Sequence, residues 1–165
     1  PVDDTAIQGG LKDFNIPGRF QIVPGPIPIV LDVAHNPQAA RALAANLARM
    51  PCRGVTRVVL GMLRDKNHAG FVGALASIGS TWHVASLGGE RGFAGADLAR
   101  VVQSAGNGAV VAVHADVPAA LSSALAACTP ADRVVVTGSF ITVGTAMAML
   151  NVNSQQGDPE NGKAT

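Results

Sequence analysis

Residues 28–40 read PIVLDVAHNPQAA, and their order of residue types predicts one repeating unit of the fold. Its first part is mostly apolar and β-branched, which is typical of a strand buried in a parallel sheet. The sequence then turns polar as far as Asn36 and becomes alanine-rich, and Pro37 suits the first turn of a helix that Asn36 can cap. The stretch therefore predicts a strand, a polar loop and a helix, in that order.

The same alternation of apolar runs and Ala- and Leu-rich stretches continues along the chain. It predicts an α/β domain with a mostly parallel six-stranded sheet. The expected strands are 20–23, 28–33, 55–60, 81–86, 109–113 and 133–137. The expected helices between and after them are 37–49, 68–78, 95–104, 118–126 and 142–150. Only residues 24–27 separate the first two strands, too few for a parallel crossover, so we expect one antiparallel edge strand.

The two ends of the chain differ in character from its centre. Residues 1–18 predict an interdomain linker with a short helix over 4–14, and the chain begins with Pro1 rather than Met, which suggests a processed or partial sequence. Residues 151–165 are polar and rich in Gly, Asn and Gln, which predicts a disordered tail. The domain itself is therefore expected to span residues 19–150.

The composition narrows the class of protein. The chain has 165 residues, of which 48% are hydrophobic and only 14% are charged, and this excludes a disordered or coiled-coil protein. Its formal charge of +1 gives no electrostatic footprint for a nucleic acid or an anionic membrane, so neither is expected as a partner.

The cysteines and the apolar runs bear on the cell compartment. Cys52 and Cys128 lie far apart without a CxxC motif, which suits reduced thiols better than a disulfide framework. The sequence has no run of 18 apolar residues and no signal-peptide pattern. We therefore expect a cytoplasmic protein.

Polar residues gather in the loops that follow the predicted strands, where an open parallel sheet binds its ligands. Asp32 could accept hydrogen bonds from a ribose or cap the next helix. His35 could contact a ligand or be a solvated surface imidazole. Gly138 and Ser139 offer backbone N–H groups to a phosphate or a carboxylate, although glycine also serves steric needs at such junctions.

Three cations occupy the loops after the third and fourth predicted strands: Arg64, Lys66 and Arg91. A single Lys or Arg in a loop is most often a solvated surface residue. Because all three are expected at one edge of the sheet, together they favour an anion-binding site.

Several motifs of other functions are absent from the sequence. There is no GxxxxGK[ST] phosphate loop, no GxGxxG followed by an acidic residue, and no GxSxG elbow. The four histidines, at positions 35, 68, 83 and 114, lack a metal-ligand spacing. No metal site is therefore expected in this chain.

Four segments in order resemble the signatures of one family. They are PGRFQ at 17–21, LDVAHNP at 31–37, GMLRDK at 61–66 and GSFITV at 138–143. Together they are similar to the C-terminal domain of the bacterial bifunctional dihydrofolate synthases/folylpolyglutamate synthases, members of the Mur-ligase superfamily. The resemblance implies a Rossmann-like three-layer domain of a ligase that uses ATP to join L-glutamate to dihydropteroate and to reduced folates through an acyl phosphate.

The resemblance also implies roles for residues in the first two segments. Arg19 matches the arginine that reaches the phosphates of ATP, a task that suits its planar, permanently charged fork. Asp32 matches the aspartate that contacts the nucleotide at the ribose. His35 matches a histidine near the nucleotide and the glutamate, so it is both a cofactor-binding and a catalytic candidate.

The remaining candidates come from the other two segments and from a neighbouring loop. Lys66, with Asp65, lies in an Asp-Lys element that the resemblance places at the domain interface, and it is the second catalytic candidate. Ser139 and its adjacent amides match the element that binds the incoming glutamate, and Arg91 is a further candidate for its carboxylate. Relatives often carry a histidine where this chain has Ile141, so any polar role of that position is absent.

The family's N-terminal ATPase domain, which holds the phosphate loop and the magnesium ligands, is not in this sequence. The resemblance therefore implies that this domain is a partner in the same polypeptide, with L-glutamate and a folate or dihydropteroate as substrates, and that the present chain is inactive alone. Two alternatives stay open: a domain of another Mur-type amino-acid ligase, and a non-catalytic module that binds a nucleotide or an amino acid.

Overall fold

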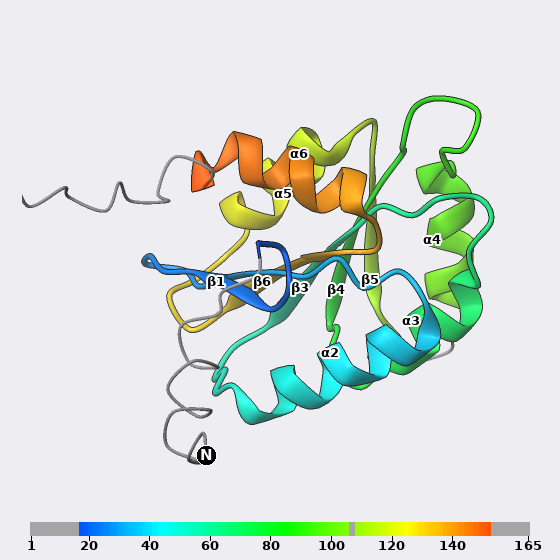
Figure 1. The fold of residues 1–165 in the computed structure, drawn as a ribbon. Coiled ribbons are helices and arrows are strands. Elements are labelled where there is room, and N and C mark those ends of the chain that lie inside the picture. The colour runs from blue at the N-terminus through cyan, green and yellow to red at the C-terminus, as the bar shows by residue number, and fades with distance from the viewer. Residues whose placement is uncertain (1–16, 106–107, 153–165) are drawn as a thin grey trace, which may run out of the picture.

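A computed structural model describes residues 17–105 and 108–152 of the chain (Figure 1). Its six-stranded sheet has the order β1-β2-β6-β3-β4-β5. The strands are β1 (Gln21–Val23), β2 (Ile29–Leu31), β3 (Thr56–Leu60), β4 (Thr81–Ala85), β5 (Val110–His114) and β6 (Arg133–Thr137). Only the β1–β2 pair is antiparallel, with Ile22 opposite Val30, so the short 24–27 connection makes the predicted edge hairpin.

Helices cover both faces of the sheet and give the expected three layers (Figure 1). They are α2 (Pro37–Arg49), α3 (His68–Leu75), α4 (Gly95–Ser104), α5 (Val117–Ala126) and α6 (Phe140–Met149). The first three pack on one face around a core that includes Leu43, Phe71 and Trp82. The other two pack on the opposite face around Leu121 and Val136. The α/β prediction is confirmed.

The helices begin where polar side chains cap them. Asn36 accepts a hydrogen bond from the Ala39 N–H at 2.8 Å, as the sequence predicts, and Asn67 accepts one from the Gly70 N–H at 2.9 Å. Such caps satisfy N–H groups that the first helical turn leaves unpaired. Because Asn36 directly follows His35, the same local geometry that starts α2 also fixes the loop before it.

Several predicted boundaries are wrong by one to three residues, and local hydrogen bonds explain the differences. The strand predicted from residue 20 begins at Gln21, because Phe20 has φ +46°, a left-handed conformation outside the strand region. The strand predicted over 28–33 ends at Leu31, because the Val33 N–H donates to the Gly18 carbonyl instead of a neighbouring strand.

Helix boundaries differ for a similar reason. The helix predicted over 142–150 begins at Phe140, because Ser139 accepts a hydrogen bond from the Thr142 N–H and thus caps a helix two residues earlier. The helix predicted over 68–78 ends at Leu75, whose carbonyl accepts from the N–H groups of Ile78 and Gly79 in a tight turn. Smaller shifts affect 55–60, 81–86, 109–113 and 118–126.

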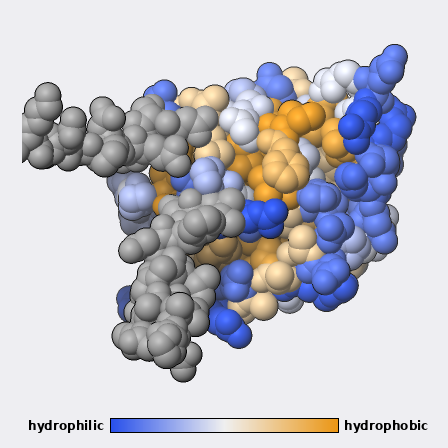
Figure 2. Space-filling view, in the orientation of Figure 1, coloured by the Kyte–Doolittle hydropathy of each residue, from blue (hydrophilic) through white to orange (hydrophobic). Residues whose placement is uncertain are grey.

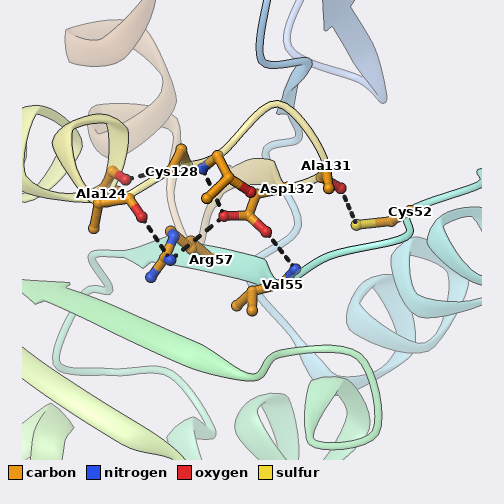
Figure 3. Close-up of polar contacts among 9 residues, drawn as sticks. Cys52, Val55, Arg57, Ala124, Cys128, Ala131 and Asp132 are labelled. Atoms are coloured by element: carbon orange, nitrogen blue, oxygen red, sulfur yellow. Dashed lines mark hydrogen bonds and ion pairs between the residues drawn. The ribbon is translucent and has the colours of Figure 1, made fainter.

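Charged residues join the strands at the edge opposite the strand-end loops. Asp132, just before β6, accepts hydrogen bonds from the backbone N–H groups of Thr129 (2.9 Å) and Val55 (2.6 Å), and its carboxylate lies 3.5 Å from Nη2 of Arg57 (Figure 3). These backbone hydrogen bonds hold the pKa of Asp132 below its ordinary value. The carboxylate therefore links the start of β3 to the start of β6.

The next residue, Arg133, fixes the far end of α2. Its buried guanidinium donates from Nη1 to the carbonyls of Leu47 and Met50, both at 2.8 Å, and from Nε to the Thr56 hydroxyl at 2.9 Å. A cation is favourable at a helix C-terminus, where carbonyls lack intrahelical partners. Arg133 thus anchors the C-terminal end of α2, and the loop with His35 precedes the N-terminal end of the same helix.

Cys52 and Cys128 are free thiols at this edge of the sheet (Figure 3). Cys52 donates to the Ala131 carbonyl and Cys128 to the Ala124 carbonyl.

Across the described residues, no helix combines the length and the apolar character that crossing a membrane requires.

The buried His83 is expected to make stability depend on pH. Its Nδ1 lies 3.3 Å from Nε2 of His114, and its side chain is 4% exposed. Burial, with smaller contributions from His114 and Arg57, lowers the pKa of His83 from 6.5 to about 4. Between these values the unfolded chain binds a proton that the folded chain does not, so the free energy of unfolding falls as the pH drops from about 6.5 to about 4.

Urea denaturation at pH 7 and pH 4.5 measures this dependence. The His83→Gln variant is expected to lose less stability between the two pH values than the parent chain does. An unchanged pH dependence in His83→Gln would show that another group causes it.

Candidate functional site

The carboxyl ends of β2, β6, β3 and β4 lie side by side at one edge of the sheet (Figure 1). This order places the loop with Asp32 and His35 next to Ser139, then the loop with Lys66, and then the loop with Arg91. All the predicted strand-end candidates therefore share one edge, but their contacts divide them between a cavity near Asp32 and a charged group around Asp65.

A tight turn brings Arg19 to the end of β2. The Gly18 carbonyl accepts from the Val33 N–H at 2.8 Å, and the Phe20 N–H donates to Oδ2 of Asp32 at 2.9 Å. Gly18 has φ +71°, and a Cβ there would meet a methyl group of Val33 at 3.1 Å, so the turn requires glycine. These bonds hold the exposed Arg19 beside the Asp32 carboxylate.

Asp32 is a half-buried acceptor at the centre of this arrangement. Its Oδ1 accepts from the Ala34 N–H at 2.8 Å, while Oδ2 accepts from Phe20. Burial raises the pKa of Asp32 above 3.8, and the two backbone hydrogen bonds and the charge of Arg19 oppose this rise. Each carboxylate oxygen has a second lone pair, so Asp32 can still accept hydrogen bonds from hydroxyl groups of a ligand.

His35 is held in one orientation by its surroundings. Its Nδ1 lies 2.9 Å from the Val33 carbonyl, which assigns the proton to Nδ1 and leaves Nε2 as an acceptor in the neutral ring. The Phe140 ring lies against the imidazole, with a centroid distance of 5.8 Å and a tilt of 43°. A neutral His35 therefore offers a ligand its Nε2 lone pair.

These side chains line one cavity of about 560 Å³ between the 17–20 turn, the β2–α2 loop, one side of α2 and the start of α6. Its lining includes Arg19, Phe20, Asp32, His35, Asn36 and Phe140. The size suits a small-molecule ligand. The cavity combines a cation, a hydroxyl acceptor and aromatic rings, which together can bind an anionic, hydroxylated molecule with a planar ring.

Phe20 and Phe140 are cavity residues that the sequence did not single out. Phe140 is 63% exposed, which is unusual for a large apolar side chain, and it is one of few aromatic residues in the chain, which make up 4% of it. An aromatic residue directly after the Gly138-Ser139 junction was the available signal. Phe20 stands in the PGRFQ segment, but the sequence predicts no role for it, because its position depends on the left-handed turn.

Ser139 lies at the same edge but is buried and engaged. Its hydroxyl accepts from the Thr142 N–H at 3.0 Å and lies 2.8 Å from the Thr142 hydroxyl, which in turn donates to the Gly61 carbonyl. The structure thus gives Ser139 a helix-capping role that ties the end of β6 to the end of β3. A role for Ser139 in ligand binding stays a prediction.

Lys66 and Arg91 form a separate group around Asp65. Lys66 Nζ lies 2.8 Å from one Asp65 oxygen, and a guanidinium nitrogen of Arg91 lies 3.7 Å from the other. The Lys66 hydrogen bond holds the pKa of the Asp65 carboxyl below its ordinary value. Neither cation lines the cavity that Asp32 and His35 share, so the predicted residues occupy two neighbouring regions. In residues 17–105 and 108–152, no three His, Cys, Asp or Glu side chains are grouped as metal ligands.

Most of the chain matches one family of ligase domains. Residues 18–140 match the model described as "Mur ligase, glutamate ligase domain". The chain belongs to this family. All three predicted cavity residues, Arg19, Asp32 and His35, fall within the matched part of the glutamate ligase domain.

Individual relatives agree with this assignment. The chain is 36% identical over 156 residues to the dihydrofolate synthase/folylpolyglutamate synthase of Escherichia coli, an alignment that covers 94% of the chain and 36% of the relative. It resembles the structure of E. coli FolC in complex with DHPP and ADP, with a TM-score of 0.83, 34% identity and coverage of 94% of this chain and 36% of that one.

A second structure, a bifunctional folylpolyglutamate synthase/dihydrofolate synthase with Mn, AMPPNP and L-glutamate bound, gives a TM-score of 0.81 at 40% identity. The match covers 92% of this chain and 36% of that one. The glutamate ligase domain described above thus spans about a third of the length of these relatives.

Proposed function

We propose that this chain serves as the C-terminal lobe of an ATP-dependent ligase that joins L-glutamate to dihydropteroate and to reduced folates. The observation that carries the proposal is the single cavity shared by Arg19, Asp32 and His35 within a glutamate ligase domain. The relatives support it, because their names describe both synthase activities and their structures hold ADP, AMPPNP and L-glutamate.

In this proposal the cavity forms one wall of the nucleotide site. Arg19 grips phosphate oxygens, since its guanidinium is exposed and makes no hydrogen bond within the described part of the chain. Asp32 accepts hydrogen bonds from the ribose hydroxyls. His35 offers Nε2 to a donor of the nucleotide or to the amine of the incoming glutamate. The Phe140 ring supplies an apolar surface beside the imidazole.

The reaction that these residues assist is the joining of a carboxylate to an amine. ATP phosphorylates the acceptor carboxylate, the glutamate amine attacks the acyl phosphate, and phosphate leaves as the amide forms. Fixed cations and donors stabilise the negative charge of the transition state, and closure over the cavity excludes water that would hydrolyse the acyl phosphate. We therefore infer that a second lobe of the same polypeptide, with the phosphate loop and the Mg²⁺ ligands, completes the site. The ATP requirement and the free thiols favour a cytoplasmic location.

A chimeric enzyme tests this function. The C-terminal part of the E. coli dihydrofolate synthase/folylpolyglutamate synthase that aligns with this chain would be replaced by this chain. Incorporation of labelled glutamate would then be measured with dihydropteroate, with a reduced folate, and without either. We expect ATP-dependent incorporation with both acceptors. A folded chimera that binds ATP but incorporates no glutamate would contradict the proposal.

A further inference from the structure

The loops after β3 and β4 are joined by a short antiparallel pairing outside the main sheet. Leu63 pairs with Gly92, the Arg64 N–H donates to the Arg91 carbonyl at 2.9 Å, and the Phe93 N–H donates to the Met62 carbonyl at 3.2 Å. The two loops therefore form one two-stranded ribbon at the carboxyl edge of the sheet.

This register places Arg64 directly opposite Arg91. Like charges at opposing positions of an antiparallel pair destabilise it, so the arrangement costs free energy unless an anion lies nearby. Lys66 adds a third cation beside them. Asp65 contacts Lys66 and Arg91, and Glu90 adds a second carboxylate, so three positive charges against two negative ones leave the ribbon a net charge of +1.

The backbone of the ribbon is fixed rather than adaptable. A Cβ at Gly92 would lie 1.8 Å from the Leu87 carbonyl oxygen, so only glycine fits there. The His68 ring stacks on Phe93 with a centroid distance of 4.0 Å and an angle of 8°, and His68 Nε2 lies 2.9 Å from the Leu63 carbonyl. The backbone positions of the two opposed arginines are therefore fixed, while their side chains are exposed.

Space and exposure favour a ligand at this ribbon. A Cβ at Gly88 or Gly89 would meet no atom within 4 Å, and the Arg91 side chain is 74% exposed. Figure 2 shows hydrophilic side chains gathered at the end of the molecule where α4 and its preceding loop lie, apart from the apolar surface over α6. Arg91 is thus open to solvent, while Arg64 donates to the Gly92 carbonyl at 3.4 Å and the partly exposed Lys66 contacts Asp65.

We propose that Arg64, Lys66 and Arg91 bind the carboxylates of a glutamyl chain on the acceptor substrate. This inference rests on the proposed function. Each ligation consumes one acceptor carboxylate and adds the two of glutamate, so an acceptor that already carries glutamate has gained negative charge with each addition. Three cations spread over two loops suit several separate carboxylates better than one compact phosphate group.

The ribbon therefore favours acceptors with longer glutamyl chains. Binding through exposed cations weakens as salt rises, because the interaction is screened. Because exposed ion pairs are individually weak, loss of one cation is expected to weaken binding by about two- to five-fold.

The test uses this chain, whose described residues hold hydrophobic cores on both faces of the sheet. The amide resonances of ¹⁵N-labelled chain would be followed during titration with γ-linked triglutamate, with L-glutamate and with ATP. We expect triglutamate to shift amides at 62–66 and 88–93, to bind at least three-fold more tightly than L-glutamate, and to weaken in 0.5 M NaCl. Arg64→Gln and Arg91→Gln are each expected to weaken binding about two- to five-fold.

Arg100→Gln is the matched control, because Arg100 is 75% exposed on α4 and ion-paired with Asp97. It is expected to bind triglutamate as the parent chain does. Equal affinity for L-glutamate and triglutamate, triglutamate shifts at Asp32 and His35 instead of the ribbon, or an equal loss in Arg100→Gln would each overturn the inference. The ATP titration is separate: absence of ATP-induced shifts at Asp32 and His35 would count against the nucleotide role and leave the ribbon result standing.

Discussion

The Arg19→Ala variant of the chimeric ligase is expected to lose at least about 100-fold in kcat/KM for ATP-dependent glutamate incorporation. Fixed donors aimed at developing charge contribute on this scale. The fold should survive, because Arg19 is exposed and makes no hydrogen bond within residues 17–105 and 108–152. A steady-state assay with saturating glutamate and varied ATP measures the loss, and circular dichroism checks the fold.

Two further variants test whether Arg19 acts through its planar guanidinium at this position or only by adding positive charge to the domain. Arg19→Lys keeps the charge but loses the planar fork, so an intermediate loss of about ten-fold is expected. Arg41→Ala removes an exposed cation of α2 that lies outside the cavity lining, and it should leave the rate unchanged. A parent-like rate in Arg19→Ala would remove Arg19 from the nucleotide site.

The Gly138→Ala variant is expected to lose about 3 kcal/mol or more of unfolding free energy. Gly138 has φ +107°, where an L-residue is strained by about 1–3 kcal/mol. In addition, its new Cβ would lie 2.6 Å from both the Gly61 carbonyl oxygen and a methyl group of Leu60. The end of β3 would have to move. Urea denaturation of this chain measures the change.

Gly144→Ala provides the matched control on α6. Gly144 is exposed, and a Cβ there would meet no atom within 4 Å. Alanine in a helix interior is more favourable than glycine by up to about 1 kcal/mol, so this variant should be slightly more stable than the parent. Equal destabilisation by both substitutions would show that the Gly138 conformation is not what the loop requires.

The order of strands and helices could be predicted because local pattern determines it here. The apolar run before Asp32 forms β2, and Asn36 with Pro37 starts α2 as the sequence indicates. The 24–27 connection was short enough to require a hairpin. Once the sheet was expected to be parallel, the rule that ligands bind at the carboxyl ends of strands led to Asp32 and His35 without any contact being known.

Long-range backbone contacts could not be predicted from the sequence. The left-handed turn at Gly18 and Phe20 depends on hydrogen bonds to residues on the far side of the β1–β2 hairpin. The pairing of Leu63 with Gly92 joins loops 29 positions apart, so no local signal reports it. Ser139 illustrates a different limit. Its place after a strand predicts a ligand contact, and the sequence did not predict that its hydroxyl caps α6.

In the proposed function, Arg19, Asp32 and His35 form one wall of a nucleotide site. Intermolecular nuclear Overhauser effects between ADP and the ring protons of His35 and Phe140, recorded on this chain with excess ADP, show whether the nucleotide lies there. We predict cross-peaks from both rings to the nucleotide and their loss in Asp32→Ala. ADP that binds the chain without cross-peaks to either ring would place the nucleotide outside this cavity.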